Sequence, residues 1–209
     1  MASEDSGDPD YVSLIATSLA AQGKDDAADS ALTRALQIAP NNSVNQAFRF
    51  HMYEWFGRWD EALRILADDT NRSPLITQEE DLAAHQAFIE AMSTQEPGAI
   101  AAARDAEYAS VRHDRAHLMV AISHLSALGL VDDAFQLASQ VPPSAQTDDT
   151  SVLFTPLNDN LRRDPRFIAL AAKLGLVTYW NGAGKWPDFC SARNLPYNCQ
   201  AQAQKIGAK

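Results

Sequence analysis

The sequence has few of the residues that build several classes of protein. Nine glycines and ten prolines among 209 residues are too few for a fibrous or low-complexity chain. Basic residues are scarce as well, because 17 Lys and Arg stand against 27 Asp and Glu. The resulting net charge of −10 argues against tight nucleic-acid binding by the chain as a whole. Hydrophobic residues make up an ordinary 46%, which excludes wholesale disorder.

Long apolar runs and a signal peptide are also missing. The longest apolar stretch, 116–131, contains two histidines and is shorter than the roughly 20 residues of a membrane span. We therefore predict no membrane span in this chain. The start, Met-Ala-Ser-Glu-Asp, is acidic where a signal peptide is basic and then apolar. We expect residues 1–9 to be disordered, and such a start suits an internal fragment of a longer protein whose targeting signals lie elsewhere.

Motifs of catalysis are absent from the sequence. It has no Gly-x-Ser-x-Gly turn, no phosphate-binding loop and no Gly-x-Gly-x-x-Gly fingerprint. The segment Gly182-Ala-Gly-Lys185 lacks the glycine spacing and the following hydroxyl residue of a phosphate loop. The carboxylates fall mostly at expected helix starts and outer faces, where solvation explains them. We predict that the chain is not an enzyme and needs no cofactor.

A repeated helical pattern is the strongest positive feature of the sequence. Residues 10–140 show the apolar spacing of helices separated by short turns. Gly23 and Gly57 are each followed five positions later by alanine, and Gly129 opens a third copy of the same pattern. Glycine readily takes the left-handed conformation that ends a helix, and a small alanine lets paired helices approach closely. We predict an all-α fold.

The repeated unit resembles the tetratricopeptide repeat (TPR), a helix–turn–helix motif of about 34 residues. Gly23 and Gly57 are separated by one unit of this length. The resemblance spans residues 10–143 and implies about four helix pairs in a right-handed solenoid. The third pair, 78–111, departs most, because Pro97-Gly98 replaces the usual turn. A repeat stack must cover its last apolar face, so we expect residues 144–209 to form a C-terminal helical cap and an irregular tail.

The C-terminal segment itself predicts a helix and carries three distinctive motifs. Asp164 suits a helix N-terminus and Gly175 a helix end. With the repeats, the motifs resemble those of a group of bacterial TPR proteins whose repeats often follow a winged-helix or nucleotide-cyclase output domain. The motifs are Leu161-Arg-Arg-Asp-Pro-Arg-Phe167, Leu174-Gly-Leu-Val-Thr-Tyr-Trp180 and Lys185-Trp-Pro-Asp-Phe-Cys190. The resemblance implies the sensory or interaction half of a larger regulator.

Cysteine and histidine are the residues most suited to special chemistry. A disulfide between Cys190 and Cys199 would stabilise the tail by about 2–3 kcal/mol and indicate an oxidising compartment. The alternatives are two buried free thiols or a metal site. The spacing of His113, His117 and His124 permits a metal site, but no Glu completes a His-Glu-x-x-His motif. We therefore predict no bound metal. The predicted location is the periplasm, as part of a membrane-anchored protein, and the alternative is the cytoplasm.

The repeat register also predicts which residues line the inner groove of the solenoid. It places Trp55 in the first helix of the second pair, where side chains reach the groove. The predicted partner groove consists of His51, Glu54, Trp55, Phe88, Met119 and Ser123. Such a groove would accept an apolar or helical peptide segment. It lacks the Lys and Asn clamp with which chaperone-binding TPR proteins hold a carboxylate.

Charge is distributed unevenly, and this bears on the predicted function. Residues 1–161 hold 9 basic and 25 acidic residues, whereas residues 162–209 hold 8 basic and 2 acidic ones. We expect the basic end to dock on the acidic body. The predicted function is non-catalytic binding of a protein or peptide, with no nucleic-acid partner. Small-ligand sensing in the groove is one alternative. Oligomerisation, as a homodimer that joins acidic and basic parts of two copies, is the other.

Overall fold

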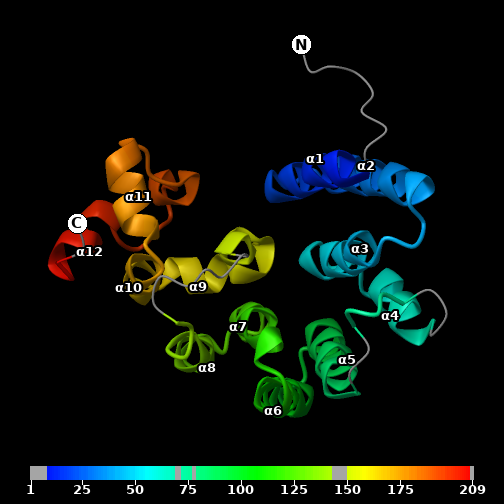
Figure 1. Ribbon diagram of the computed structural model, residues 1–209. Helices are drawn as coiled ribbons and strands as arrows, with labels where there is room; N and C mark the ends of the chain where they lie inside the picture. The colour runs from blue at the N-terminus through cyan, green and yellow to red at the C-terminus, as the bar shows by residue number, and fades with distance from the viewer. Residues whose placement is uncertain (1–8, 69–71, 77–78, 143–149, 208–209) are drawn as a thin grey trace. The chain divides into compact units, whose positions relative to one another are not determined.

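The structure is a computed structural model that describes residues 9–68, 72–76, 79–142 and 150–207. Every regular element in this part of the chain is a helix, and none is a strand (Figure 1). The predicted all-α class is therefore confirmed. Residues 1–8 lie outside the described part. The first described helix begins at Pro9.

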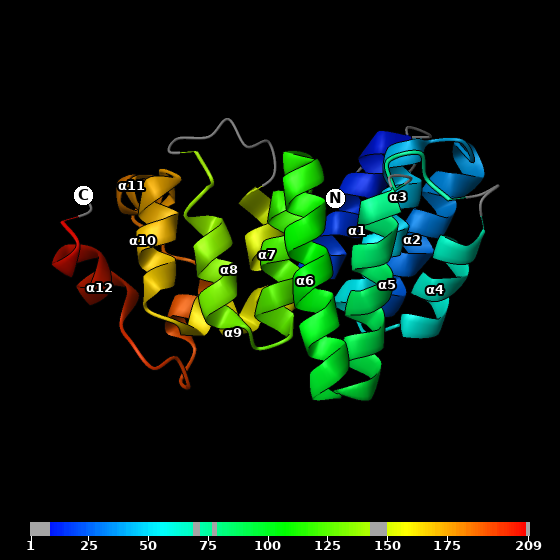
Figure 2. The same cartoon turned by 90° about the horizontal axis from the view of Figure 1, so that it is seen from below.

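The chain divides into two compact units, Met1–His113 and Asp114–Lys209. Unit 1 contains the first six helices. They are α1 (Pro9–Ala21), α2 (Asp25–Ile38), α3 (Ser43–Trp55), α4 (Trp59–Ala67), α5 (Glu79–Thr94) and α6 (Pro97–His113). Each of these helices packs against the next one in sequence. Figures 1 and 2 show this most clearly for α5 and α6, which lie side by side along most of their lengths.

The turns of unit 1 follow the predicted glycine pattern. Gly23 joins α1 to α2 with φ +70°, and Gly57 joins α3 to α4 with φ +69°. Both values lie in the left-handed region that ends a helix at little steric cost for glycine. Ala28 and Ala62, five positions after each glycine, are fully buried. The sequence therefore predicted both the helix ends and the small residues at the helix contacts.

The third helix pair reaches the same kind of turn without glycine. Gln95 stands between α5 and α6 with φ +56°, the one non-glycine residue of the described chain with positive φ. Its side-chain amide donates to the carbonyls of Ala91 and Met92 at 3.3 and 2.9 Å. These bonds satisfy carbonyl groups that the end of α5 would otherwise leave unpaired. Helix α6 then begins at Pro97, the residue that marked this turn as unusual in the sequence.

Unit 2 is built from shorter elements. They are η1 (Arg115–His117), α7 (Leu118–Ala127), α8 (Val131–Ala138), η2 (Thr150–Phe154), η3 (Pro156–Asn158), α9 (Asp159–Arg163), α10 (Arg166–Lys173), α11 (Leu176–Ala183), η4 (Asp188–Ser191) and α12 (Cys199–Lys205), where η denotes a 3-10 helix. Gly129 joins α7 to α8 with φ +76°, as the third glycine of the pattern predicted. No described helix of either unit is long and apolar enough to cross a membrane.

The division between the units differs from the domain boundary we predicted. We predicted repeats over 10–143 and a cap over 144–209, a boundary that lies outside the described residues. The structure divides the chain after His113 instead. The reason is that α7 packs on α8 and also on η2, η3 and α9. The fourth predicted helix pair therefore shares its core with the C-terminal segment.

The C-terminal part of unit 2 has an aromatic core. The Asp164 carboxylate accepts a hydrogen bond from the Arg166 amide at 2.8 Å, and α10 begins at Arg166, two residues after the predicted N-terminus. Phe167 is fully buried, with its ring centroid 6.2 Å from that of Phe154 and 5.4 Å from that of Phe189. These edge-on ring pairs are favourable aromatic contacts. They pack together a region whose α-helices are each only five to eight residues long.

The end of the chain is less irregular than we predicted. Residues Cys199–Lys205 form helix α12, which the sequence pattern did not indicate to us. The Asn198 side chain accepts from the Ala201 amide at 2.8 Å and caps this helix. An asparagine before a run without glycine or proline was the available signal.

Candidate functional site

Helix α3 carries the residues on which our candidate site is built. It begins where the Asn42 side chain accepts from the Asn45 amide at 3.0 Å, a standard helix cap. It ends at Trp55, just before the left-handed Gly57. Most of its length is amphipathic, with Phe50 among the fully buried residues. The helix is thus held firmly enough to position the polar and aromatic side chains of its other faces.

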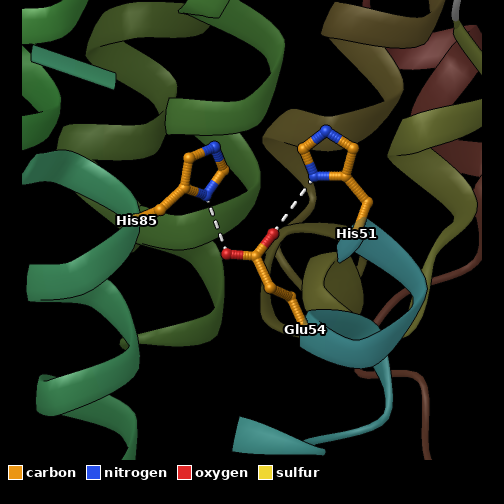
Figure 3. A group of neighbouring side chains, drawn as sticks. All are labelled: His51, Glu54 and His85. Atoms are coloured by element: carbon orange, nitrogen blue, oxygen red, sulfur yellow. Dashed lines mark hydrogen bonds and ion pairs between the residues drawn. The ribbon is translucent and has the colours of Figure 1, made fainter. Parts of the chain in front are cut away.

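A buried carboxylate between two histidines is the most unusual feature of unit 1 (Figure 3). Nδ1 of His51 lies 3.1 Å from one Glu54 carboxylate oxygen, and Nδ1 of His85 lies 2.8 Å from the other. The exposed fraction is 1% for the Glu54 side chain, 3% for His85 and 26% for His51. When the carboxylate is ionised it only accepts hydrogen bonds, and each ring then donates its Nδ1–H. This triad links α3 to α5.

The aromatic ring of Phe50 lies beside the triad. The ring of Phe50 stands edge-on to that of His85, with 4.7 Å between the centroids, and is 5.3 Å from that of His51. The two histidine rings are 5.5 Å apart. A buried charge is costly unless it is paired and hydrogen-bonded. Because both Glu54 oxygens have a histidine donor, the carboxylate is tolerated, and removing either histidine would take one of these donors away.

A half-buried aromatic pair lies on the same helix as the triad. The rings of Phe48 and Trp55 meet edge-on with 5.3 Å between their centroids. Phe48, His51 and Trp55 follow one another at helical spacings of three and four, so they share one face of α3. All three are partly exposed. We call these three residues the α3 stripe.

The predicted groove residues are placed differently from one another. His51 and Glu54 meet in the triad, and Trp55 lies in the α3 stripe. Phe88 is fully buried in unit 1, where its ring stands edge-on to Trp59 at 5.9 Å. The buried Glu54 and Phe88 side chains offer a partner almost no surface in this conformation.

The other two predicted groove residues lie on α7 in unit 2. Ser123 is 2% exposed and accepts a hydrogen bond from the Asn158 amide at 2.7 Å. Met119 keeps part of its surface exposed. Three of the six predicted residues, His51, Trp55 and Met119, therefore keep an appreciable accessible surface.

Two residues of the candidate site were not predicted, although signals for both were present. His85 follows His51 at the same separation as Gly57 follows Gly23. A repeated histidine at the repeat period should have indicated that equivalent positions face each other across neighbouring pairs. Phe48 precedes Trp55 by two helical turns and therefore belongs on the same face.

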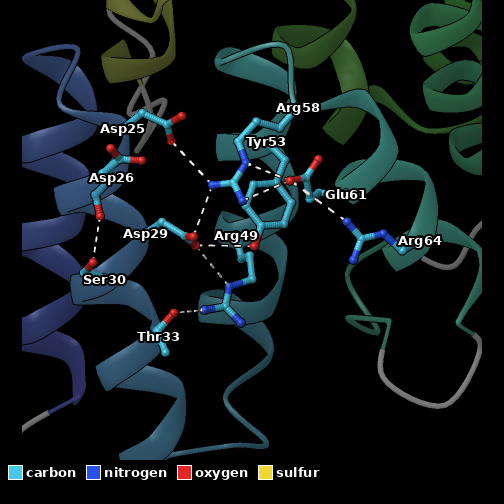
Figure 4. A network of polar contacts seen from close by, with 10 residues as sticks. All are labelled: Asp25, Asp26, Asp29, Ser30, Thr33, Arg49, Tyr53, Arg58, Glu61 and Arg64. Atoms are coloured by element: carbon cyan, nitrogen blue, oxygen red, sulfur yellow. Dashed lines mark hydrogen bonds and ion pairs between the residues drawn. The ribbon is translucent and has the colours of Figure 1, made fainter.

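A second polar network joins α2, α3 and α4 around Arg58 (Figure 4). The Arg58 guanidinium donates to Asp29 and to Glu61, both at 3.1 Å, and lies 4.4 Å above the Tyr53 ring. Burial alone would lower the pKa of Arg58, but the hydrogen bonds to these carboxylates raise it above its usual value. Burial raises the pKa of Tyr53. The partners are mutually paired, which makes this network a structural link between helices.

Two hollows in the described part of the chain lie below or at the low end of the size range of small-molecule sites. The one next to the Arg58 network has a volume of about 240 Å³, below the 300–1,000 Å³ of typical small-molecule sites. It is lined by Arg49, Tyr53, Glu61, Arg64, Ile65 and Asp68. Another, of about 330 Å³, lies between α8 and α10 in unit 2. Its two cations are already engaged, because Arg166 pairs with Asp132 and Lys173 donates to the Ser139 carbonyl.

The cysteines and the remaining histidines are the other residues that the sequence singled out. Cys190 and Cys199 form a disulfide with an S–S distance of 2.02 Å, so the predicted pairing is confirmed and the thiol and metal alternatives are wrong. His113 ends α6 and lies 3.4 Å from a Glu80 oxygen, whereas His117 lies in η1. His113 and His117 therefore do not share a helix face.

Comparison with known proteins finds no matching family model, no similar curated protein and no similar solved structure.

Proposed function

We propose that this chain is a non-catalytic TPR-like module that binds a protein or peptide segment, as the sensory or interaction half of a larger bacterial regulator. The helix pairs α1–α2 and α3–α4 support the repeat, because a left-handed glycine joins each pair and the two glycines are one repeat length apart. In TPR-like packing the first helix of each pair lines the inner face. Helix α3 is such a first helix.

The α3 stripe is the observation that carries this proposal. Phe48 and Trp55 are partly exposed and braced against each other, and His51 stands between them on the same face. Aromatic anchors held at i, i+3 and i+7 match the spacing with which an amphipathic helix presents its apolar residues. Rigid, half-buried aromatic residues also contribute much of the energy in protein interfaces. The stripe therefore suits an apolar helical segment of a partner.

A macromolecular partner is favoured over a small ligand. Of the two hollows described above, the one beside the Arg58 network is small and lined mostly by polar residues, and the cations around the one between α8 and α10 are already paired. A small molecule would find in these two hollows neither a deep apolar cavity nor convergent free polar groups. An extended face with aromatic anchors needs no such cavity.

The disulfide bears on the compartment in which the module works. Disulfides persist in oxidising compartments and are rare in a bacterial cytosol. The bond between Cys190 and Cys199 therefore supports our proposal of a periplasmic module of a membrane-anchored regulator. In that arrangement the output domain lies on another part of the same protein.

Selection from a display library of helical peptides, with the intact oxidised chain as bait, tests this function. We expect enriched peptides with apolar residues at i, i+3 or i+4, and i+7. Trp55→Ala should weaken their binding about 10-fold or more. The matched control is Tyr179→Ala, which removes an aromatic side chain that is 70% exposed on α11; it should leave affinity unchanged.

Two outcomes would contradict the proposal. One is a library that yields no enriched peptide. The other is a set of peptides that bind the Trp55→Ala and wild-type chains equally well. Light scattering on the same samples distinguishes peptide binding from oligomerisation. A wild-type dimer that dissociates in the Trp55→Ala variant would identify a second copy of the chain as the partner.

A further inference from the structure

The donor atoms of the buried triad form a set that metals favour. Two histidine nitrogens and a Glu54 carboxylate oxygen all lie within 4.8 Å of one another. Two imidazoles and one carboxylate are a common ligand set for zinc and related ions. The three side chains come from two helices of the same compact unit, so the fold already assembles them.

The three side chains would need only local rearrangement to hold a metal ion, because one donor atom of each already lies within 4.8 Å of the others. Ligands that surround a tetrahedral zinc with bonds of about 2.1 Å are separated by about 3.4 Å. The histidine Nδ1 atoms lie 3.1 and 2.8 Å from the nearest Glu54 oxygens. These are two different oxygens, so a carboxylate that binds an ion through one oxygen would have to turn toward the more distant ring, and the ion would also push the closest pair apart by roughly 0.3–0.6 Å. Each ring would move its remaining proton to Nε2 when Nδ1 becomes a ligand.

We propose that His51, Glu54 and His85 form a binding site for a divalent transition-metal ion, with Zn²⁺ as the natural probe. This site does not depend on the proposed function. Two nitrogen ligands favour zinc-like ions over Mg²⁺ and Ca²⁺, which prefer oxygen. Phe50 closes one side of the site, whereas His51 is 26% exposed and gives an ion access from solvent. Three protein ligands leave a fourth position for water or for a partner side chain.

Zinc titration of the metal-free, oxidised chain by calorimetry tests the site. We expect a tight binding component of one ion per chain. Glu54→Gln keeps the shape and a hydrogen-bonding carbonyl but removes the charge, and His51→Ala removes the most exposed ligand. Each should weaken this component at least about 100-fold, more than the loss of an outer-shell partner does. His113→Ala, which removes an exposed histidine paired with Glu80, is the control and should change nothing.

A second measurement on the wild-type chain does not rely on the variants folding. Nitrogen-15 NMR of the histidine rings reports which nitrogen carries the proton. Zinc should convert His51 and His85 from the Nδ1–H to the Nε2–H form and leave His113 unchanged. Rings that keep the Nδ1–H form in excess zinc would overturn the site, and so would tight binding that survives Glu54→Gln. In either case the triad is a purely structural set of hydrogen bonds.

Discussion

Unit 1 and unit 2 are stabilised by different means. Unit 1 has long helices, 16 residues in α5 and 17 in α6, which are joined by short turns and linked by buried polar groups such as Glu54. The longest described α-helix of unit 2, α7, has 10 residues. Unit 2 also buries polar side chains, such as Ser123 and Asn158, and adds a cluster of aromatic rings and the disulfide. Both units thus bury polar groups, and the unit with the shorter helices adds a ring cluster and a covalent link.

The largest expected effect concerns the aromatic core of unit 2. Phe167→Ala removes a fully buried ring between Phe154 and Phe189, and should lower the free energy of unfolding by about 3–5 kcal/mol. Denaturant unfolding followed by circular dichroism measures it. Tyr179→Ala, on the surface of the same unit, should change stability by less than about 0.5 kcal/mol. Equal effects of the two variants would show that the ring cluster is not the core of unit 2.

The next largest effect concerns the disulfide. The double variant Cys190→Ala/Cys199→Ala should destabilise unit 2 by about 2–3 kcal/mol, because the reduced chain has more conformational freedom when unfolded. Hydrogen exchange should become faster in α10 and α12, which pack together, and stay unchanged in α1–α6. Ser191→Ala, an exposed change next to Cys190, is the control. Faster exchange throughout unit 1 would contradict the separate stabilisation of the two units.

A third prediction compares one glycine from each unit. Gly23→Ala should cost about 1–2 kcal/mol, because alanine is strained at φ +70° although its Cβ would meet nothing within 4 Å. Gly182→Ala, inside α11 and also in open space, should instead stabilise by about 0.4–1 kcal/mol. Thermal unfolding of both variants shows whether each substitution raises or lowers the stability of the chain. A stabilising Gly23→Ala would contradict the role of the left-handed turn in the repeat.

The smallest effects concern pH and have opposite signs in the two units. A hydrogen bond from Arg166 lowers the pKa of Asp164 below its ordinary 3.8, so the stability that Asp164 contributes is present above this pH and is lost as the pH falls further. Burial raises the pKa of Asp25 above 3.8, so its ionisation removes stability as the pH rises through the raised value. Each effect should be below about 1 kcal/mol.

The pH comparison is made with Asp164→Asn and Asp25→Asn, unfolded at several values between pH 3 and pH 7. The free energy of unfolding of the wild-type chain minus that of Asp164→Asn should increase as the pH rises. The same difference for Asp25→Asn should decrease as the pH rises. If both differences changed with pH in the same direction, the assigned causes of the two pKa shifts would be contradicted.

The sequence predicted the features that depend on local chemistry. Gly23, Gly57 and Gly129 marked helix ends because only glycine adopts the left-handed conformation cheaply. Asp164 marked the start of α10 for an equally local reason, since its side chain caps the next turn. The disulfide followed from two cysteines in a segment too irregular to pack well alone.

The features that depend on tertiary packing could not be predicted in the same way. His85 meets Glu54 across two helices, 31 residues away in the sequence, and only the repeat spacing of His51 and His85, not any local rule, indicates such a contact. Gln95 adopts a conformation typical of glycine because its amide replaces the missing helix bonds, which its residue type does not reveal. The division after His113 depends on which helices α7 packs against.

Hydrogen exchange of the intact, oxidised chain with and without a selected helical peptide tests the central claim most directly, because it locates the bound partner on the chain. We predict slower exchange along α3, between Ser43 and Trp55, and no comparable change in α10–α12. Protection that is confined to unit 2, with α3 unchanged, would contradict the assignment of partner binding to the α3 stripe.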